Sequence, residues 1–190
     1  DMDASRRAIL KESSIPVGTV PIYQAVVETV EEKGGLIHLT VDKIFEVIER
    51  QAEDGVDFIT VHCGLTRAAL EMLRKQGRIT DIVSRGGAFL TTWMLHHDRE
   101  NPLYEDYDRL LSIAKEYDVT LSLGDGLRPG SLADATDRAQ IHELMTLGHL
   151  AERAWEQDIQ VMIEGPGHVP LDQIEANVIL QKRLCRHAPF

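Results

Sequence analysis

Five short apolar runs, separated by longer amphipathic segments, constrain the fold of this chain more than any other feature. None of the runs alternates apolar with polar residues in the way of a strand that has one exposed face. Continuous apolar runs of this length are typical of parallel strands whose two faces are both covered. We therefore predict strands at residues 18–23, 57–62, 81–84, 119–125 and 159–165.

The segments between these runs have the residue spacing of amphipathic helices. Thr40 has the side chain of a good N-cap, and Gly77 is suited to the position just after a helix. In the longest segment, Met145 falls on or near the apolar face together with Ile141 and Leu144. Helices are predicted for residues 40–52, 66–77, 88–97, 104–117, 137–155 and 171–184.

Alternating strands and helices with short connections predict right-handed βαβ units and a parallel sheet, which is an α/β fold. The GxGxxG fingerprint of many open, doubly wound sheets is absent from the sequence. A closed (β/α)8 barrel needs roughly 250 residues, so five strands in 190 residues would make about five-eighths of one. We therefore expect a partial (β/α)8 TIM-type barrel, with residues 1–190 forming the central portion of one catalytic domain. The chain starts with DMDASRRAIL, without an initiator Met and already in a helical pattern, so we expect it to be a segment of a longer protein.

Composition argues against several classes of function. The formal net charge of −11 argues against nucleic acid or an anionic membrane surface as the main partner. The two cysteines, Cys63 and Cys185, form no CxxC motif, so we expect neither a disulfide framework nor a thiolate zinc site. No apolar run reaches 18 residues and no signal-peptide pattern is present, which makes a cytoplasmic location the default expectation.

Polar or aromatic residues follow each of the five predicted strands. The carboxyl ends of parallel strands share one rim, where the sites of barrels and open α/β sheets form, so these side chains should converge. Turn chemistry alone often places glycine or aspartate after a strand, but it does not explain two arginines, two carboxylates and two histidines. The candidate site residues are Tyr23, His62, Ser84, Arg85, Gly86, Asp125, Gly126, Leu127, Arg128, Glu164 and His168.

Two of these loops have features of anion sites, and each also has a simpler explanation. At Ser84-Arg85-Gly86 a helix is expected to begin, so backbone N–H groups, the helix N-terminus and the arginine could all attract an anion. The alternative is a tight turn with a surface arginine. Asp125 and Arg128 could bind a hydroxyl and a phosphate of one ligand, or they could simply pair with each other in a loop stiffened by proline.

The two histidines are ambiguous by themselves. His62 ends a buried strand, where a hydrogen-bonded core histidine is the common case. His168 follows two glycines in a loop flanked by Pro166 and Pro170, and such stiffness suits a metal ligand. One histidine does not make a metal site, and no HxxxH or HxH pattern accompanies it, so further ligands would have to come from elsewhere.

Taken in order, five motifs of the chain resemble one family. They are PVGTVPIYQA, GVDFITVHCG, IVSRGG, LSLGDGLRPGSLADA and VMIEGPGHVP, and they span nearly the whole chain. Their order and intervals are similar to those of the ThiC family, the phosphomethylpyrimidine synthases of thiamine biosynthesis. The last two motifs are highly specific to that family.

The resemblance implies a (β/α)8-barrel enzyme of the non-canonical radical S-adenosylmethionine type, a carbon–carbon lyase. Such an enzyme would rearrange 5-aminoimidazole ribonucleotide into 4-amino-5-hydroxymethyl-2-methylpyrimidine phosphate. A [4Fe–4S] cluster, held by three cysteines near the C-terminus, would supply the electron that cleaves S-adenosylmethionine. The resemblance also implies a homodimer and a divalent metal ion, commonly zinc.

By the same resemblance, the candidate residues divide into two sets. His168 corresponds to the first of two histidines that hold the metal. The others correspond to positions that bind the ribonucleotide, and no residue is assigned a catalytic role.

The chain also departs from the family pattern. The three cluster cysteines, the second metal histidine and the last barrel strands have no counterparts in residues 1–190, so we expect the segment alone to be inactive. Two other functions stay open. A paralogue could make 5-hydroxybenzimidazole, the lower ligand of a cobamide, from the same ribonucleotide. A barrel fragment could also serve as a non-catalytic binding protein.

Overall fold

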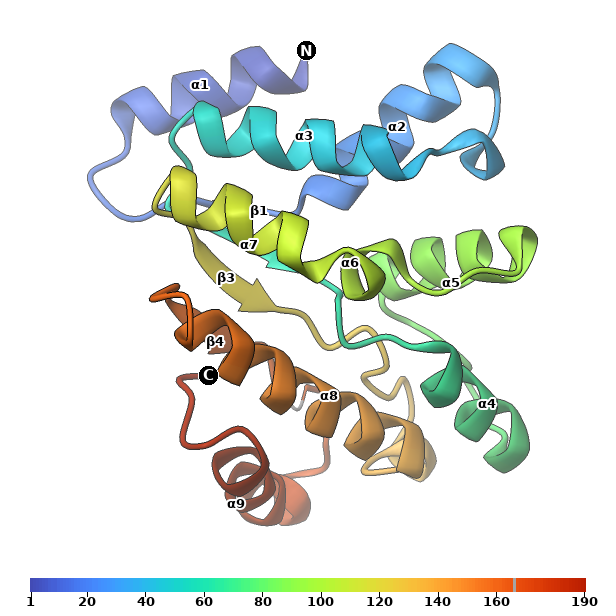
Figure 1. Ribbon diagram of the computed structural model, residues 1–190. Helices are drawn as coiled ribbons and strands as arrows, with labels where there is room; N and C mark the ends of the chain where they lie inside the picture. Colours follow the sequence, from blue (N-terminus) through green and yellow to red (C-terminus); the bar gives the residue numbers. More distant parts are fainter. Residues whose placement is uncertain (166) are drawn as a thin grey trace.

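Residues 1–165 and 167–190 are described by the computed structural model, and within them four parallel strands form a single sheet (Figure 1). The strands lie side by side in chain order, with Phe58 opposite Thr120 and Leu121 opposite Val161. They are β1 (Gly18–Thr19), β2 (Phe58–Val61), β3 (Thr120–Leu123) and β4 (Val161–Ile163). The predicted α/β fold with a parallel sheet is confirmed, and the arrangement is consistent with part of a barrel.

Helices connect the strands and pack on one another. The described helices are α1 (Met2–Glu12), α2 (Pro21–Lys33), α3 (Val41–Glu53), α4 (Arg67–Gln76), α5 (Arg85–His97), α6 (Pro102–Glu105), α7 (Tyr107–Glu116), α8 (Arg138–Trp155) and α9 (Ile174–Leu184), with short 3-10 helices at η1 (Leu36–His38), η2 (Leu132–Asp134) and η3 (Leu171–Gln173). In Figure 1, α3 and α7 lie side by side, and α8 contacts α4, α9 and β4. None of the described helices has the length and apolar character needed to cross a membrane.

The predicted start of α3 and the predicted end of α4 are confirmed, but one residue placed on a helix face was wrong. The Thr40 hydroxyl accepts a hydrogen bond from the Lys43 N–H, and Gly77 ends α4 with a φ of 73°. Met145, however, is 45% exposed, so its placement on the buried face was wrong. It lies about 100° around α8 from Leu144, which is enough to turn its side chain away from the core.

Two cross-strand rows of apolar residues form the buried face of the sheet. Ile59, Leu121 and Val161 pair across one row, and Val61, Leu123 and Ile163 occupy the same face two residues further along. All six side chains are buried. On the opposite face Thr60 and Met162 are only half-buried, so the two faces of these strands are not equally covered.

The predicted strand at residues 81–84 was wrong. β2 and β3 pair directly with each other, so this segment does not lie between them in the sheet. Asp81 has a φ of 46°, which is incompatible with an extended strand, and Ser84 is the N-cap of α5. The segment is instead an irregular connection that leads from α4 to α5.

The predicted strand at residues 18–23 is also shorter than expected. Pro21 occupies the first helical position of α2, where its missing N–H costs no hydrogen bond. The chain therefore leaves the sheet after Thr19. As a result, Tyr23 lies in the first turn of α2 and not at the end of a strand.

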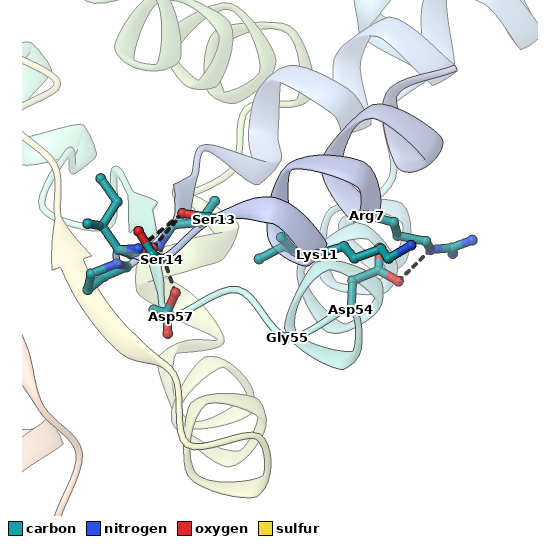
Figure 2. A pocket seen from close by; sticks show the side chains of 11 residues that line it. Arg7, Lys11, Ser13, Ser14, Asp54, Gly55 and Asp57 are labelled. Atoms are coloured by element: carbon teal, nitrogen blue, oxygen red, sulfur yellow. Dashed lines mark hydrogen bonds and ion pairs between the residues drawn. The ribbon is translucent and has the colours of Figure 1, made fainter.

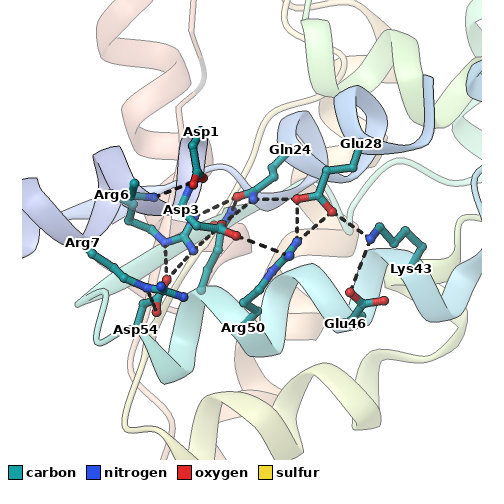
Figure 3. A network of polar contacts seen from close by, with 12 residues as sticks. Asp1, Asp3, Arg6, Arg7, Gln24, Glu28, Lys43, Glu46, Arg50 and Asp54 are labelled. Atoms are coloured by element: carbon teal, nitrogen blue, oxygen red, sulfur yellow. Dashed lines mark hydrogen bonds and ion pairs between the residues drawn. The ribbon is translucent and has the colours of Figure 1, made fainter. Parts of the chain in front are cut away.

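A network of charged and amide side chains attaches α1 to α2 and α3 (Figure 3). Arg6 is buried and pairs with Asp54 at the end of α3, and it also donates to the Gln24 side chain at 2.8 Å. Arg50 of α3 donates two hydrogen bonds to Glu28 of α2, at 2.7 and 2.8 Å. These contacts hold α1, α2 and α3 together. Of the predicted site residues, Tyr23 alone lies on one of these three helices.

Candidate functional site

Three predicted site residues lie within two residues of the ends of β2, β3 and β4. His62 and Asp125 are buried, with 2% and 6% of their surfaces exposed, and Glu164 is half-buried. The Glu164 N–H donates to the Leu123 carbonyl at 2.9 Å, which keeps the ends of β3 and β4 in register. We call this edge, together with the starts of α2 and α5, the rim.

Asp125, Arg128 and Glu164 form a compact charged group on the rim. Arg128 Nη1 lies 2.9 Å from Asp125 Oδ1 and 4.0 Å from Glu164 Oε1. The Asp125 N–H donates to Glu164 Oε2 at 3.2 Å. Burial and the nearby Glu164 carboxylate raise the pKa of Asp125 to about 6, while Arg128 opposes that rise. One guanidinium thus serves two carboxylates, and the group is accessible because Arg128 is 21% exposed and Glu164 is 41% exposed.

His62 lies between two glycines that leave room for its ring. A Cβ at Gly86 would overlap the imidazole, and one at Gly124 would come within 3.1 Å of its Cδ2. Burial, and secondly the charge of Arg128, lower the pKa of His62 to about 4, so the ring is neutral at pH 7. Within the described part of the chain, His62 Nδ1 is buried without a hydrogen-bond partner. A buried nitrogen without a partner is costly unless a ligand satisfies it.

The turn at residues 84–87, which we call the Ser84 turn, begins α5 next to the loop at residues 125–128, the Asp125 loop. The Ser84 hydroxyl accepts a hydrogen bond from the Gly87 N–H at 3.2 Å, so Ser84 serves as the helix cap. A Cβ at Gly87 would overlap the carbonyl oxygen of Gly126, which means that the two loops touch at their backbones. The exposed Arg85 lies over the Tyr23 ring, 5.5 Å from its centroid.

The structure therefore brings most of the predicted residues together. Tyr23 contacts Arg85, His62 packs against Gly86, and the Ser84 turn contacts the Asp125 loop. Gly126 and Leu127 differ from the rest, because Leu127 is fully buried and the N–H groups of both residues are already bonded within the protein. A ribonucleotide role for these two residues stays a prediction.

Sequence reasoning missed the residues beneath the rim. Glu143 of α8, which is 1% exposed, accepts hydrogen bonds from the N–H groups of Gly126 and Leu127 at 2.9 and 2.8 Å. Burial raises the pKa of Glu143 to about 8. Asn101 donates to the carbonyls of His62 and Leu65, each at 2.8 Å. One signal was present in the sequence: Glu143 is spaced four residues from Leu147 on the apolar face of the predicted helix.

A cavity of about 690 Å³ lies away from the rim (Figure 2). It is lined by residues that precede β1 and β2, such as Val17 and Asp57, and therefore opens at the amino ends of the strands. Its polar groups are largely paired with each other, because Arg7 donates to Asp54 at 2.8 Å and the Val17 N–H donates to Asp57 at 2.7 Å. No predicted site residue lines it, and the rim is the better candidate.

Comparison with known proteins places the whole chain in one family. Residues 1–190 match the radical SAM ThiC family over their whole length. The chain belongs to the radical SAM ThiC family. It is 66% identical to the phosphomethylpyrimidine synthase of Moorella thermoacetica, 65% to that of Desulforamulus reducens and 64% to that of a Thermoanaerobacter species, each over 190 residues. All of this chain is covered in each comparison, but it spans only 44% of the length of each relative.

In this ThiC chain, one ring nitrogen of His168 lies against a backbone carbonyl, and the described residues place no complete metal-ligand set around it. Its Nδ1 lies 3.0 Å from the Pro129 carbonyl oxygen, an arrangement in which Nε2 stays available to a metal. Its φ of 62° is unusual for a residue other than glycine. No group of three histidine, cysteine, aspartate or glutamate side chains in residues 1–165 and 167–190 could hold a metal ion. Pro166, which was expected to stiffen this loop, lies outside the described residues.

The two cysteines of the ThiC chain do not fit an iron–sulfur cluster. Cys63 and Cys185 are both buried and carry free thiols. Burial raises the pKa of the Cys185 thiol to about 11, and it raises that of Cys63 even further. Iron–sulfur clusters are held by several cysteine thiolates, and these two buried thiols do not supply such a ligand set.

Proposed function

We propose that this chain provides the ribonucleotide-binding side of a phosphomethylpyrimidine synthase in thiamine biosynthesis. The substrate would be 5-aminoimidazole ribonucleotide, and the product 4-amino-5-hydroxymethyl-2-methylpyrimidine phosphate. Family membership and the names of relatives at 64–66% identity support the proposal. The observation that carries it is the grouping of Arg128, Asp125 and Glu164 beside the neutral His62 on the rim.

Each member of the rim has a chemistry that suits part of this substrate. Arg128 has five N–H donors, of which the Asp125 contact uses one nitrogen, Nη1, so further donors can meet a phosphate. Asp125 and Glu164 can accept hydrogen bonds from sugar hydroxyls or from the amino group of the imidazole. His62, being neutral, can donate and accept one hydrogen bond each.

Radical chemistry in this family implies S-adenosylmethionine and a [4Fe–4S] cluster, and the cluster would supply the electron that cleaves S-adenosylmethionine. Because Cys63 and Cys185 do not fit a cluster, its ligands would come from outside residues 1–190, and this chain alone would not turn over. We further propose that His168 is one ligand of a zinc ion or another divalent metal, and that the full-length protein is a homodimer.

The test is product identification with the full-length protein, its cluster reconstituted under anaerobic conditions. Incubation with 5-aminoimidazole ribonucleotide, S-adenosylmethionine and a reductant should yield the pyrimidine phosphate, as read by mass spectrometry. Formation of 5-hydroxybenzimidazole would assign the protein to the cobamide pathway instead. Ribonucleotide binding without any product, in a protein with an intact cluster, would favour a non-catalytic binding protein.

A further inference from the structure

A buried arginine lies directly beneath the Asp125 loop. Arg78 follows α4, and its side chain has no exposed surface. Its Nε and Nη2 donate to the two carboxylate oxygens of Asp137, at 2.6 and 2.9 Å. This two-pronged pair is the strongest geometry available to an arginine and a carboxylate.

The remaining N–H groups of Arg78 reach the Asp125 loop and the segment before the Ser84 turn. Nη2 donates to the Leu127 carbonyl at 2.6 Å, and Nη1 lies 3.4 Å from the Arg128 carbonyl. Nη1 also lies 3.3 Å from the carbonyl of Asp81, three residues before Ser84. With the two bonds to Asp137, each of the five guanidinium N–H groups has one acceptor. Arg78 therefore joins the Asp125 loop to the segment that leads into the Ser84 turn.

Two acidic residues of the α8 region complete the contact. Asp137 is the N-cap of α8 and accepts a hydrogen bond from the Gln140 N–H at 2.8 Å. Through Asp137, the side chain of Arg78 is therefore held in a fixed position relative to α8. Glu143, six residues further along α8, accepts hydrogen bonds from the N–H groups of Gly126 and Leu127. Glu143 thus binds backbone N–H groups of the Asp125 loop, and Arg78 binds backbone carbonyl groups of the same loop.

We propose that Arg78, Asp137 and Glu143 form a clamp that positions Arg128 and Asp125 for the ribonucleotide. This inference rests on the proposed function of the rim. The three are positioning residues, since all are buried below the loop that they hold. A contribution to stability does not by itself explain why charged residues are buried here, because apolar residues of similar volume often stabilise a core as well as a buried ion pair does. A fixed loop geometry is what the clamp provides.

The clamp makes a specific prediction about ligand affinity in the full-length protein. Arg78→Lys keeps the charge but loses the fork that reaches Asp137 and the loop carbonyls together. Glu143→Gln keeps the shape but turns an NH2 group toward one of the two backbone donors. Each variant should bind 5-aminoimidazole ribonucleotide about 10- to 100-fold more weakly in calorimetric titration, by analogy with the losses seen when groups that orient metal ligands are removed.

A matched control separates positioning from general destabilisation. Arg50 of α3 is also largely buried and donates two hydrogen bonds to Glu28 in the second half of α2. Arg50→Lys should lower the midpoint of urea unfolding, as Arg78→Lys should, and should leave ribonucleotide affinity unchanged. Equal losses of affinity in Arg50→Lys and Arg78→Lys would overturn the clamp, since both would then act through stability.

A double-mutant cycle tests whether Arg78 acts through Arg128. If it does, Arg78→Lys should cost much less affinity in the Arg128→Ala background than in the wild type. Losses that add to within about twofold, the accuracy expected for independent sites, would overturn the proposal. Glu143→Gln in the same background provides the second test should Arg78→Lys fail to fold.

Hydrogen exchange distinguishes a failure of the clamp from a failure of the proposed function. The amides of Gly126 and Leu127 should exchange faster in Glu143→Gln than in the wild type without any ligand, and unchanged exchange would overturn the clamp. A second outcome is faster exchange in Glu143→Gln together with no ribonucleotide binding by the wild type. The clamp would then hold the loop as inferred, but the proposed function would fail. The clamp's role in positioning residues for the ribonucleotide would fail with it.

Discussion

At His62 the surroundings decide the protonation state. The ring is buried, and Arg128 adds a positive charge, so its pKa falls from 6.5 to about 4. Glu164 reaches the same space from β4, since a Cβ at Gly124 would meet both side chains. A neutral imidazole whose Nδ1 has no hydrogen-bond partner among the described residues is suited to a hydrogen bond with a polar ligand, which is the role proposed for it above.

The lowered pKa of His62 predicts acid destabilisation. Between pH 6.5 and pH 4 the unfolded chain binds a proton at this residue that the folded chain does not, so stability present above pH 6.5 is lost as the pH falls toward 4. At about pH 5 the loss is roughly 2 kcal/mol, from 1.36 kcal/mol per pH unit. Urea unfolding of the full-length protein and of His62→Gln, at about pH 7.5 and pH 5, measures it. The wild type should lose that much more stability than the variant, and parallel losses would contradict a neutral His62.

At His168 the prediction concerns a metal. His168→Ala should remove bound divalent metal from the dialysed full-length protein, measured by elemental analysis. His97→Ala is the matched control, because His97 Nε2 also lies 3.0 Å from a backbone carbonyl, that of Ile37, at the far end of α5. Metal content that is unchanged in His168→Ala, or that falls equally in His97→Ala, would exclude His168 as a ligand.

At the scale of elements, an apolar run predicted a strand correctly where the segment pairs with a neighbouring strand of the sheet. β2, β3 and β4 lie within the predicted segments, because their residues form the two buried cross-strand rows. The run at 81–84 has a similar composition but no position in the sheet, and only the direct pairing of β2 with β3 reveals this. For β1 the sequence contained the signal: Pro21 suits the first turn of a helix better than a strand.

The contact between α5 and the Asp125 loop predicts the effect of a single methyl group. Gly87→Ala would favour the helix by up to about 1 kcal/mol, but its Cβ would overlap the Gly126 carbonyl. Since that neighbour is backbone, we expect net destabilisation of about 1–3 kcal/mol by urea unfolding, with weaker ribonucleotide binding. Gly35→Ala is the control, because a Cβ there meets only ordinary contacts at 3.8 Å or more. A Gly87→Ala protein as stable as the wild type would mean that the two loops do not touch.

At the scale of the whole molecule, the rim gathers residues that are up to 141 positions apart, from Tyr23 to Glu164. Their convergence could be predicted, because parallel strands bring their carboxyl ends to one edge. The clamp could not be predicted from the sequence. Arg78 binds backbone carbonyls and Asp137 caps a helix, and such contacts follow no periodic sequence pattern. Glu143 could have been noticed as a carboxylate on an apolar helix face, but its partners are visible only in the structure.

The proposed site depends on whether Arg128 binds the ribonucleotide or only pairs with Asp125. Calorimetric titration of 5-aminoimidazole ribonucleotide into the full-length protein and its Arg128→Ala variant decides between them. A phosphate contact contributes about 1.5–3 kcal/mol, so the variant should bind roughly 10- to 150-fold more weakly. Arg153→Ala, which removes an exposed arginine paired with Asp108, should leave the affinity unchanged. Wild-type affinity in Arg128→Ala would contradict the account, because the Asp125 loop would then lie outside the site.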